Sequence, residues 1–271
     1  MIRALKAALT AIILALSLAA PVAAGPYEDG DAAFFRGDYA TALVLYRTLA
    51  DQGYAGPQSN LGTMYANGLG VPQDYAEAAK WYRKAADQGD ASAQYSLGNM
   101  YDNGRGVPQN YAEAVSWLRK AADQGFAGAQ FNLALKYYDG QGVPQDYAQA
   151  ANWFRKAADQ GHASAQSNLG NMYSNGRGVP QNYAEARKWR GLAADQGNAT
   201  AQYNLGHMYD IGQGTPQDFV QAHMWFNLAA AASRDETDRA DAVRRRENLA
   251  SRMTPSQVAE AQRRASAWKP K

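Results

Sequence analysis

Few side chains in this sequence could do chemistry, and their spacing argues against a catalytic or metal-binding site. The three histidines, His162, His207 and His223, never lie four residues apart, the spacing that lets one helix present two metal ligands. Ser266 and Lys269 match the Ser-x-x-Lys pattern of β-lactam-binding enzymes, but the companion Ser-Asp-Asn and Lys-Thr-Gly motifs are missing. The sequence therefore predicts no catalytic residue, no metal site and no cofactor.

Composition and charge narrow the function classes further. The 271 residues include no cysteine, which excludes disulfides, thiolate metal sites and cysteine nucleophiles. Five Gly-x-Gly loops, such as Gly104 to Gly106, resemble nucleotide-binding motifs, but no predicted strand precedes them. The 27 basic residues include Arg3 and Lys6 near the start; without these two, 25 basic side chains face 25 acidic ones. This balance argues against nucleic acid as a partner.

Residues 1–24 are predicted to be a secretory signal peptide. Arg3 and Lys6 precede an apolar run over residues 7–20, and Val22 to Ala24 supply the small residues of a cleavage site. The alternative is an uncleaved anchor helix, but the run is shorter than the roughly 20 residues of a bilayer span. Cleavage would leave a periplasmic or secreted chain with no membrane span.

The elements that must position any site are repeats of 36 residues. The segment Val71 to Gly89 returns at Val107, Val143 and Val179 without insertion or deletion, and in weaker form at Thr215. A fixed period in this range is typical of a solenoid, whose repeats bury their apolar faces only by stacking on one another. We predict five full repeats after a degenerate one at residues 25–54; the five are residues 55–90, 91–126, 127–162, 163–198 and 199–234 (together 55–234).

Each repeat is predicted to form two helices joined by a Gly-x-Gly-Val-Pro loop. The two glycines allow the chain to reverse, and the proline disfavours helix at the residue before it. Asp74 and its equivalents lie where the N-cap of the second helix belongs, and Gly89 and its equivalents lie just past its end. Residues 235–271 lose the repeat and are predicted to form C-terminal capping helices, the last one beginning near Thr254 and Pro255.

The repeated residues resemble a known family. The pattern Ala-x-Ala-Gln-x-x-Leu-Gly-x-Met-Tyr, followed by Gly-x-Gly-Val-Pro-Gln-x-Tyr-x-x-Ala-x-x-Trp and Ala-Ala-Asp-Gln-Gly, matches residues 91–125 and 163–197 almost throughout. It is similar to the Sel-one-like repeat, a relative of the tetratricopeptide repeat with a longer loop between its helices. The resemblance implies an all-α fold, a right-handed αα superhelical solenoid, and a role as scaffold, adaptor or signalling regulator.

Three positions vary within the first helix of each repeat while their neighbours stay fixed. Their spacing of i, i+4 and i+7 places them on one face of the helix, opposite the fixed Leu61, Gly62 and Tyr65. In tetratricopeptide-like stacks the first helices line the concave surface. We therefore predict a partner-binding groove; its residues are Tyr95, Asn99, Asp102, Phe131, Leu135, Tyr138, Asn171, Tyr203, His207 and Asp210. The alternative is that these are free surface positions with no shared role.

The repeat at 127–162 departs most from the others. Phe131, Leu135 and Tyr138 form an apolar stripe on its first helix, with Asn99 and Asn171 at the equivalent positions on either side. An apolar centre with a polar rim is typical of a binding hot spot. The alternative is that the stripe packs against the adjacent second helix and belongs to the core.

The sequence favours binding over catalysis. We expect a periplasmic or secreted protein that captures a segment of another protein in its groove. Two other functions stay open: a cell-wall-associated enzyme resembling a β-lactamase, and a module that associates with the cell wall by binding peptidoglycan through groove tyrosines.

Overall fold

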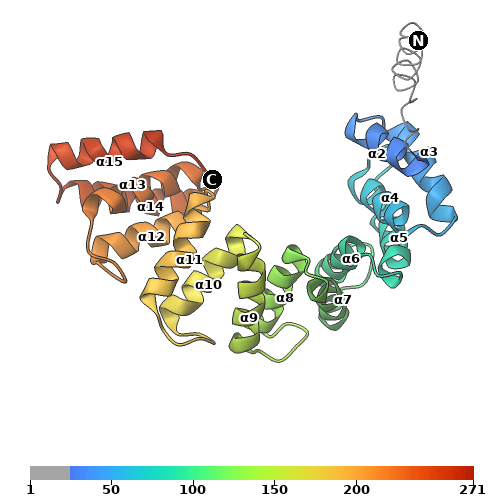
Figure 1. The fold of residues 1–271 in the computed structure, drawn as a ribbon, viewed down its shortest axis with the longest axis horizontal. Helices are drawn as coiled ribbons and strands as arrows, with labels where there is room; N and C mark the ends of the chain where they lie inside the picture. Colours follow the sequence, from blue (N-terminus) through green and yellow to red (C-terminus); the bar gives the residue numbers. More distant parts are fainter. Residues whose placement is uncertain (1–24) are drawn as a thin grey trace, which may run out of the picture. The chain divides into compact units, whose positions relative to one another are not determined.

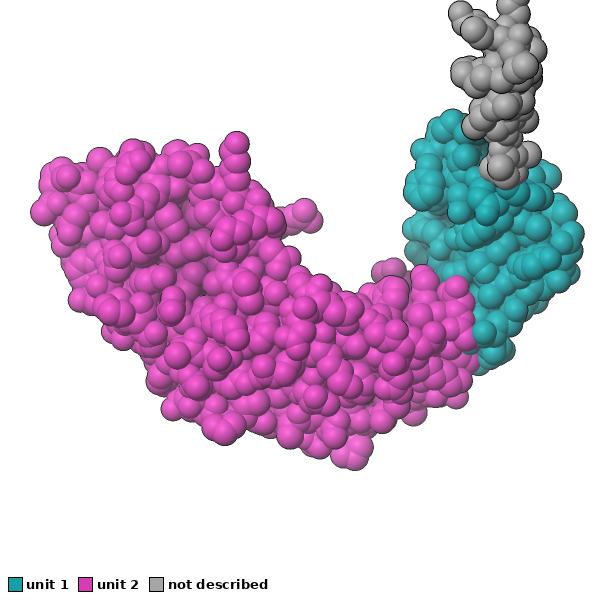
Figure 2. All heavy atoms as spheres, in the orientation of Figure 1, with its two compact units in different colours: residues 1–88 teal, residues 89–271 magenta. Residues whose placement is uncertain are grey.

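The computed structural model describes residues 25–271, so the predicted signal peptide at residues 1–24 lies outside the described residues. The described chain is all helical, with no strand in that range, and its helices follow one another in pairs (Figure 1). They form two compact units, unit 1 ending at Gln88 and unit 2 running from Gly89 to Lys271 (Figure 2). The all-α repeat fold predicted from the 36-residue period is confirmed.

The helices keep the period of the sequence. Unit 1 contains α2 (Pro26–Phe35), α3 (Tyr39–Asp51), α4 (Ala55–Asn67) and α5 (Tyr75–Asp87). Unit 2 begins with the repeat pairs α6 (Ala91–Asn103) and α7 (Tyr111–Asp123), α8 (Ala127–Asp139) and α9 (Tyr147–Asp159), α10 (Ala163–Asn175) and α11 (Tyr183–Asp195), and α12 (Ala199–Ile211) and α13 (Phe219–Ala232). It ends with α14 (Glu236–Ala250) and α15 (Pro255–Ala267). We call α4, α6, α8, α10 and α12 the first helices of their repeats, and α5, α7, α9, α11 and α13 the second helices.

Local side-chain chemistry sets where these helices begin and end. Asp146 accepts hydrogen bonds at 2.9 Å from the backbone N–H groups of Ala148 and Gln149. The equivalent Asp or Asn caps every other second helix, with two such bonds in α5 and α7 and one in α11 and α13. The first helices end at a glycine in the left-handed region. Gly104, with φ of 66°, closes α6 by donating its N–H to the carbonyl of Met100.

Stacked second helices carry most of the core of unit 2. Each helix from α6 to α13 packs against the next along the chain, and α15 lies against α13. Trp153 and Phe154 on α9 are both buried, together with small residues such as Ala150 and Ala157 that let the helices approach closely. The equivalent residues of the other full repeats are buried tryptophans too, so this is a packing position; they are Trp81, Trp117, Trp189 and Trp225.

Buried glutamines explain two further fixed positions of the repeat. Gln130 on α8 is buried, donates from Nε2 to the carbonyl of Ala122, and accepts at Oε1 from Gln160 at 2.8 Å. The same pair recurs in three of the other four full repeats. The last repeat lacks it because Ala232 occupies the second glutamine position, and the buried Oε1 of Gln202 has no partner among the described residues.

The C-terminal helices close the stack of unit 2. Thr254 caps α15 with a reciprocal capping box to Gln257. Trp268, just past α15, meets Trp225 of α13 edge-on with 6.5 Å between ring centroids, and Met224 is buried in the same cluster. Within residues 25–271, no helix combines the length and the apolar character needed to cross a membrane.

Candidate functional site

The variable positions of the first helices form a half-buried surface, which we call the first-helix face. In unit 2 it consists of Tyr95, Asn99 and Asp102 on α6, Phe131, Leu135 and Tyr138 on α8, Ser167, Asn171 and Ser174 on α10, and Tyr203, His207 and Asp210 on α12. Ser167 is buried and the others are half-buried. Each of these side chains therefore has part of its surface covered by neighbouring residues.

Hydrogen bonds connect the middle positions of this face from one first helix to the next. Asn99 on α6 accepts at Oδ1 from Asn132 on α8 at 2.7 Å. Asn171 on α10 accepts at Oδ1 from Asn204 on α12 at 3.3 Å. We call these contacts asparagine rungs. They hold neighbouring first helices together across the face.

The rung between α8 and α10 is missing. Leu135 occupies the acceptor position, so the amide of Asn168 donates instead to the carbonyl of Ser164 in its own helix, at 2.9 Å. A hollow of about 260 Å³ lies at this break. Its lining residues are Leu135, Tyr138, Asp139, Asn168, Asn171, Met172, Asn175 and Arg177. Three predicted groove residues, Leu135, Tyr138 and Asn171, thus line one hollow.

The apolar stripe of α8 is divided between the core and this hollow. Phe131 stacks on His162 with 4.7 Å between ring centroids and contacts the buried Phe154 at 5.7 Å. Tyr138 meets Tyr147 edge-on at 5.1 Å and lines the hollow with Leu135. Phe131 therefore acts mainly in packing, whereas Leu135 and Tyr138 line the hollow.

His162 is a capping residue rather than a simple linker residue. Its Nδ1 accepts a hydrogen bond from the N–H of Ala165 at 3.2 Å, so it caps α10, and its ring supports Phe131. Burial lowers the pKa of His162. The sequence hides this role because histidine is not a usual N-cap residue.

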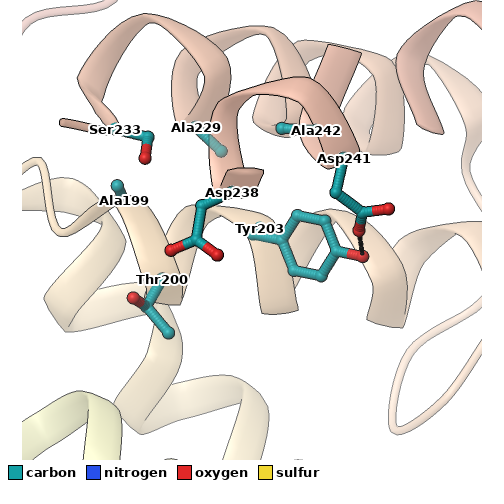
Figure 3. Close-up of a pocket in the computed structure, with 8 residues that line it drawn as sticks. All are labelled: Ala199, Thr200, Tyr203, Ala229, Ser233, Asp238, Asp241 and Ala242. Carbon is teal, nitrogen blue, oxygen red and sulfur yellow. Dashed lines mark hydrogen bonds between the residues drawn. The ribbon is translucent and has the colours of Figure 1, made fainter. Parts of the chain in front are cut away.

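At the C-terminal end, the first-helix face meets the capping helix α14. The Tyr203 hydroxyl donates to Asp241 on α14, and Asp210 pairs with Arg252 just past α14 at 3.1 Å. Burial and the nearby Arg245 lower the pKa of His207. A smaller cavity of about 140 Å³ remains beside Tyr203 (Figure 3). It is lined by Ala199, Thr200, Tyr203, Ala229, Ser233, Asp238, Asp241 and Ala242. Tyr203, His207 and Asp210 are thus not brought together with the hollow at Leu135.

Sequence reasoning missed Arg190, which lies on α11 and contacts Asn171, one of the residues that line the hollow. The equivalent residues in the other repeats are Tyr82, Leu118, Phe154 and Phe226. The side chain of Arg190 fills the same slot, its Cγ being 2.8 Å from where a Cβ on Gly170 would lie. Its terminal nitrogen donates to Asn171 Oδ1 at 2.9 Å, and the residue is 7% exposed. The sequence does mark Arg190, because it is the one charged residue at a repeat position that is otherwise apolar or aromatic.

The residues that first suggested chemistry do not converge in the structure. Ser266 is exposed on α15 and Lys269 is exposed beyond that helix, with no partner motif near them in sequence. Over residues 25–271, no group of three or more histidine, cysteine, aspartate or glutamate side chains is arranged to hold a metal ion. The arrangement around the hollow offers apolar contact and hydrogen bonding instead.

The chain is a repeat protein of the solenoid class. Its helix pairs stack at a 36-residue period, and their first helices share a face of variable residues. The Sel1 repeat model matches residues 22–54, 58–90, 91–126, 127–162, 163–198 and 199–233. The chain therefore belongs to the Sel1 repeat family, whose members are commonly protein-interaction scaffolds and generally not catalysts. None of the curated proteins matches it.

Two solved structures show the same fold. A protective antigen of uropathogenic Escherichia coli, which displays an SLR fold, is 37% identical over 89% of this chain with a TM-score of 0.78. This chain spans only 52% of that protein's length. A Sel1 repeat protein from Oxalobacter formigenes is 29% identical, with a TM-score of 0.76, and the match covers 92% of this chain and 98% of the other.

Proposed function

We propose that the protein is an interaction scaffold that captures a segment of a partner protein on the first-helix face of unit 2, centred on the hollow between α8 and α10. The observation that carries the proposal is the missing rung at Leu135. Where an asparagine would connect the two helices, an apolar side chain leaves a hollow of about 260 Å³ open on the face.

The lining of the hollow suits a peptide ligand. Leu135, Met172 and the ring of Tyr138 supply apolar contact, and Asn168, Asn175 and other amides lie around them. An apolar centre surrounded by polar groups is the arrangement found where a few side chains carry most of the binding free energy. The volume accommodates one or two side chains of an incoming segment.

Selection of binders from a random peptide display library, using residues 25–271 as bait, tests this function. Leu135→Asn gives this position the residue found at Asn99 and Asn171, and Asn168 should then form the missing rung. We expect selected peptides to lose at least tenfold in affinity, about 1.4 kcal/mol, with little change in melting temperature.

Asn99→Leu is the matched control, because it removes a rung elsewhere on the face and leaves the hollow intact. It should retain the selected peptides. Failure to select any peptide whose binding depends on Leu135 would refute the proposed function.

We further propose that the protein is exported. The basic start, the apolar run and the small residues before Gly25 support cleavage after Ala24. Intact-mass measurement on a periplasmic fraction should find a chain beginning at Gly25. A retained leader in the membrane fraction would overturn this location.

A further inference from the structure

We propose that the hollow at Leu135 recognises a carboxylate, so that the captured segment carries an aspartate or glutamate next to an apolar residue. This inference rests on the proposed function and specifies the chemistry of the partner. Three residues carry it: Asn171 and Arg177, which line the hollow, and Arg190, which donates a hydrogen bond to Asn171.

Arg190 is a buried cation without a counter-ion. It is 7% exposed, its Nε has no hydrogen-bond partner, and no carboxylate among residues 25–271 lies within ion-pairing distance of its guanidinium. Burial lowers the pKa of Arg190 to about 10, which leaves it charged near neutral pH. A buried, unpaired charge is costly, and the other repeats avoid the cost with Tyr, Leu or Phe at this position. Buried ionisable groups with perturbed pKa values cluster at functional sites, where they interact with a ligand or substrate.

Asn171 connects this cation to the hollow, because it accepts a hydrogen bond from Arg190 and is one of the residues that line the hollow. Its Oδ1 accepts from both Arg190 and Asn204, and two donors on one atom fix which end of the amide is the oxygen. The Nδ2 group is thereby left as a donor, and the guanidinium on the opposite end of the amide strengthens it by polarisation. Asn171 is one of the residues that line the hollow, and its Nδ2 is the donor assigned to the carboxylate.

Arg177 supplies a second positive group. Its NH1 donates to the Tyr138 hydroxyl at 2.5 Å, and its guanidinium lies 6.0 and 5.8 Å from the ring centroids of Tyr138 and Tyr147. Two aromatic rings therefore hold its orientation. No carboxylate in the described part of the chain pairs with Arg177, so its remaining donors are open to a ligand.

One acidic residue also lines the hollow. Asp139 is the last residue of α8 and is exposed to solvent. Solvent screens the charge of Asp139 and also that of Arg177, which is exposed too, whereas Arg190 is buried and acts through a fixed amide. The charges near the hollow thus favour an anionic group. Because Leu135, Met172 and Tyr138 lie beside them, the ligand should combine a carboxylate with an apolar side chain.

Three labelled octapeptides with the core Leu-x-Phe-x-Leu, where x is glutamate, glutamine or lysine, test the inference by fluorescence anisotropy. The glutamate peptide should bind the chain of residues 25–271 at least tenfold more tightly than the glutamine peptide, and this preference should shrink as salt rises. The lysine peptide should bind most weakly.

Two variants assign the preference to residues. Arg190→Phe restores the residue of Phe154 and Phe226; it should abolish the preference for glutamate while raising the melting temperature. Arg177→Gln introduces the residue found at the equivalent positions Gln141 and Gln213. It should lower the affinity for the glutamate peptide about tenfold and leave the affinity for the glutamine peptide unchanged. Asp139→Asn removes a negative charge from the lining and should raise the affinity for the glutamate peptide.

Equal affinity of the wild type for the glutamate and glutamine peptides would overturn the inference, as would an unchanged preference in both Arg190→Phe and Arg177→Gln. If binding still depends on Leu135 in that case, the proposed scaffold function stands without the carboxylate. If no peptide binds in a Leu135-dependent way, the scaffold function itself fails.

Discussion

Lys136 lies on α8 where the other four full repeats have methionine. Its side chain is 8% exposed, and its Nζ pairs with Asp102 of the preceding repeat and donates to Gln141 Oε1 at 2.9 Å. A buried ion pair contributes little net stability compared with well-packed apolar residues, but removing one partner leaves the other charge unpaired. The pair therefore connects two repeats at a cost that methionine would avoid.

Asp102→Ala should accordingly destabilise the protein by about 3 kcal/mol, because Lys136 would stay buried without a counter-ion. Lys136→Met should change the free energy of unfolding by only about 1 kcal/mol in either direction. Chemical denaturation of both variants and of the double variant measures this. Equal losses in the two single variants would show that the lysine is not the costly partner.

His223 on α13 gives the protein a pH-dependent stability. It is 2% exposed, its Nδ1 has no partner among the described residues, and burial together with the nearby Arg246 lowers its pKa. The unfolded chain, with an ordinary histidine pKa of about 6.5, therefore binds the proton more tightly than the folded one. Stability is full above that pH and is lost as the pH falls through the folded pKa.

His223→Gln should therefore reduce the drop in melting temperature between pH 7 and pH 5. The dependence of melting temperature on pH should not vanish, because burial also lowers the pKa values of His162 and His207. Asp241 and Glu260, whose pKa values are lowered by hydrogen bonds, contribute only at more acidic pH. An identical slope in the variant and the wild type would rule out the histidine as the titrating group.

At the scale of one helix and its loop, substituting two glycines by alanine should change the free energy of unfolding in opposite directions. Gly178 follows α10 with φ of +69°, and a Cβ there would lie 2.1 Å from the carbonyl oxygen of Tyr147. Gly191 lies inside α11, with no atom within 4 Å of an added Cβ. The first glycine is required by close backbone approach, whereas the second only weakens its helix.

Gly178→Ala should lower the free energy of unfolding by at least about 2 kcal/mol, because both the backbone conformation and the contact resist a side chain. Gly191→Ala should raise it by about 0.5–1 kcal/mol through helix propensity. Thermal and denaturant unfolding of the two variants provide the comparison. Destabilisation by Gly191→Ala would mean that α11 needs this glycine for a reason other than propensity.

The helices could be predicted from the sequence because local chemistry determines them. Asp146 and its equivalents cap their helices in any context, and the glycine and proline pattern fixes the loops. The hollow could not be predicted, since it depends on whether Asn168 bonds to its own helix or to the neighbouring one. Arg190 was visible only as a departure from the pattern, and its contact with Asn171 required three dimensions.

Across the whole molecule, the departures from the repeat gather in two neighbouring repeats. Leu135 and Lys136 lie in the repeat at 127–162, and Arg190 lies in the repeat at 163–198. In a stack held together by nearest-neighbour contacts, stability is close to a sum over repeats and their interfaces. Costly residues can therefore accumulate at one interface while regular repeats on either side maintain the fold.

The same additivity predicts how the tryptophans of unit 2 should differ. Trp153 lies in the middle of the stack, is 6% exposed, and carries the Nζ of Lys156 at 3.9 Å from its ring centroid. Trp268 lies at the C-terminal end, is half-buried, and meets Trp225 at its edge. A central side chain supports contacts with repeats on both sides, and a terminal one supports contacts on one side only.

Trp153→Ala should therefore cost about 3–5 kcal/mol of unfolding free energy, and Trp268→Ala about 1–2 kcal/mol. Denaturant unfolding of residues 25–271 gives both values, and Trp153→Phe, which keeps an aromatic ring in the stack, should cost less than Trp153→Ala. A loss for Trp268→Ala as large as that for Trp153→Ala would show that the cap, and not the central repeats, limits the stability of the stack.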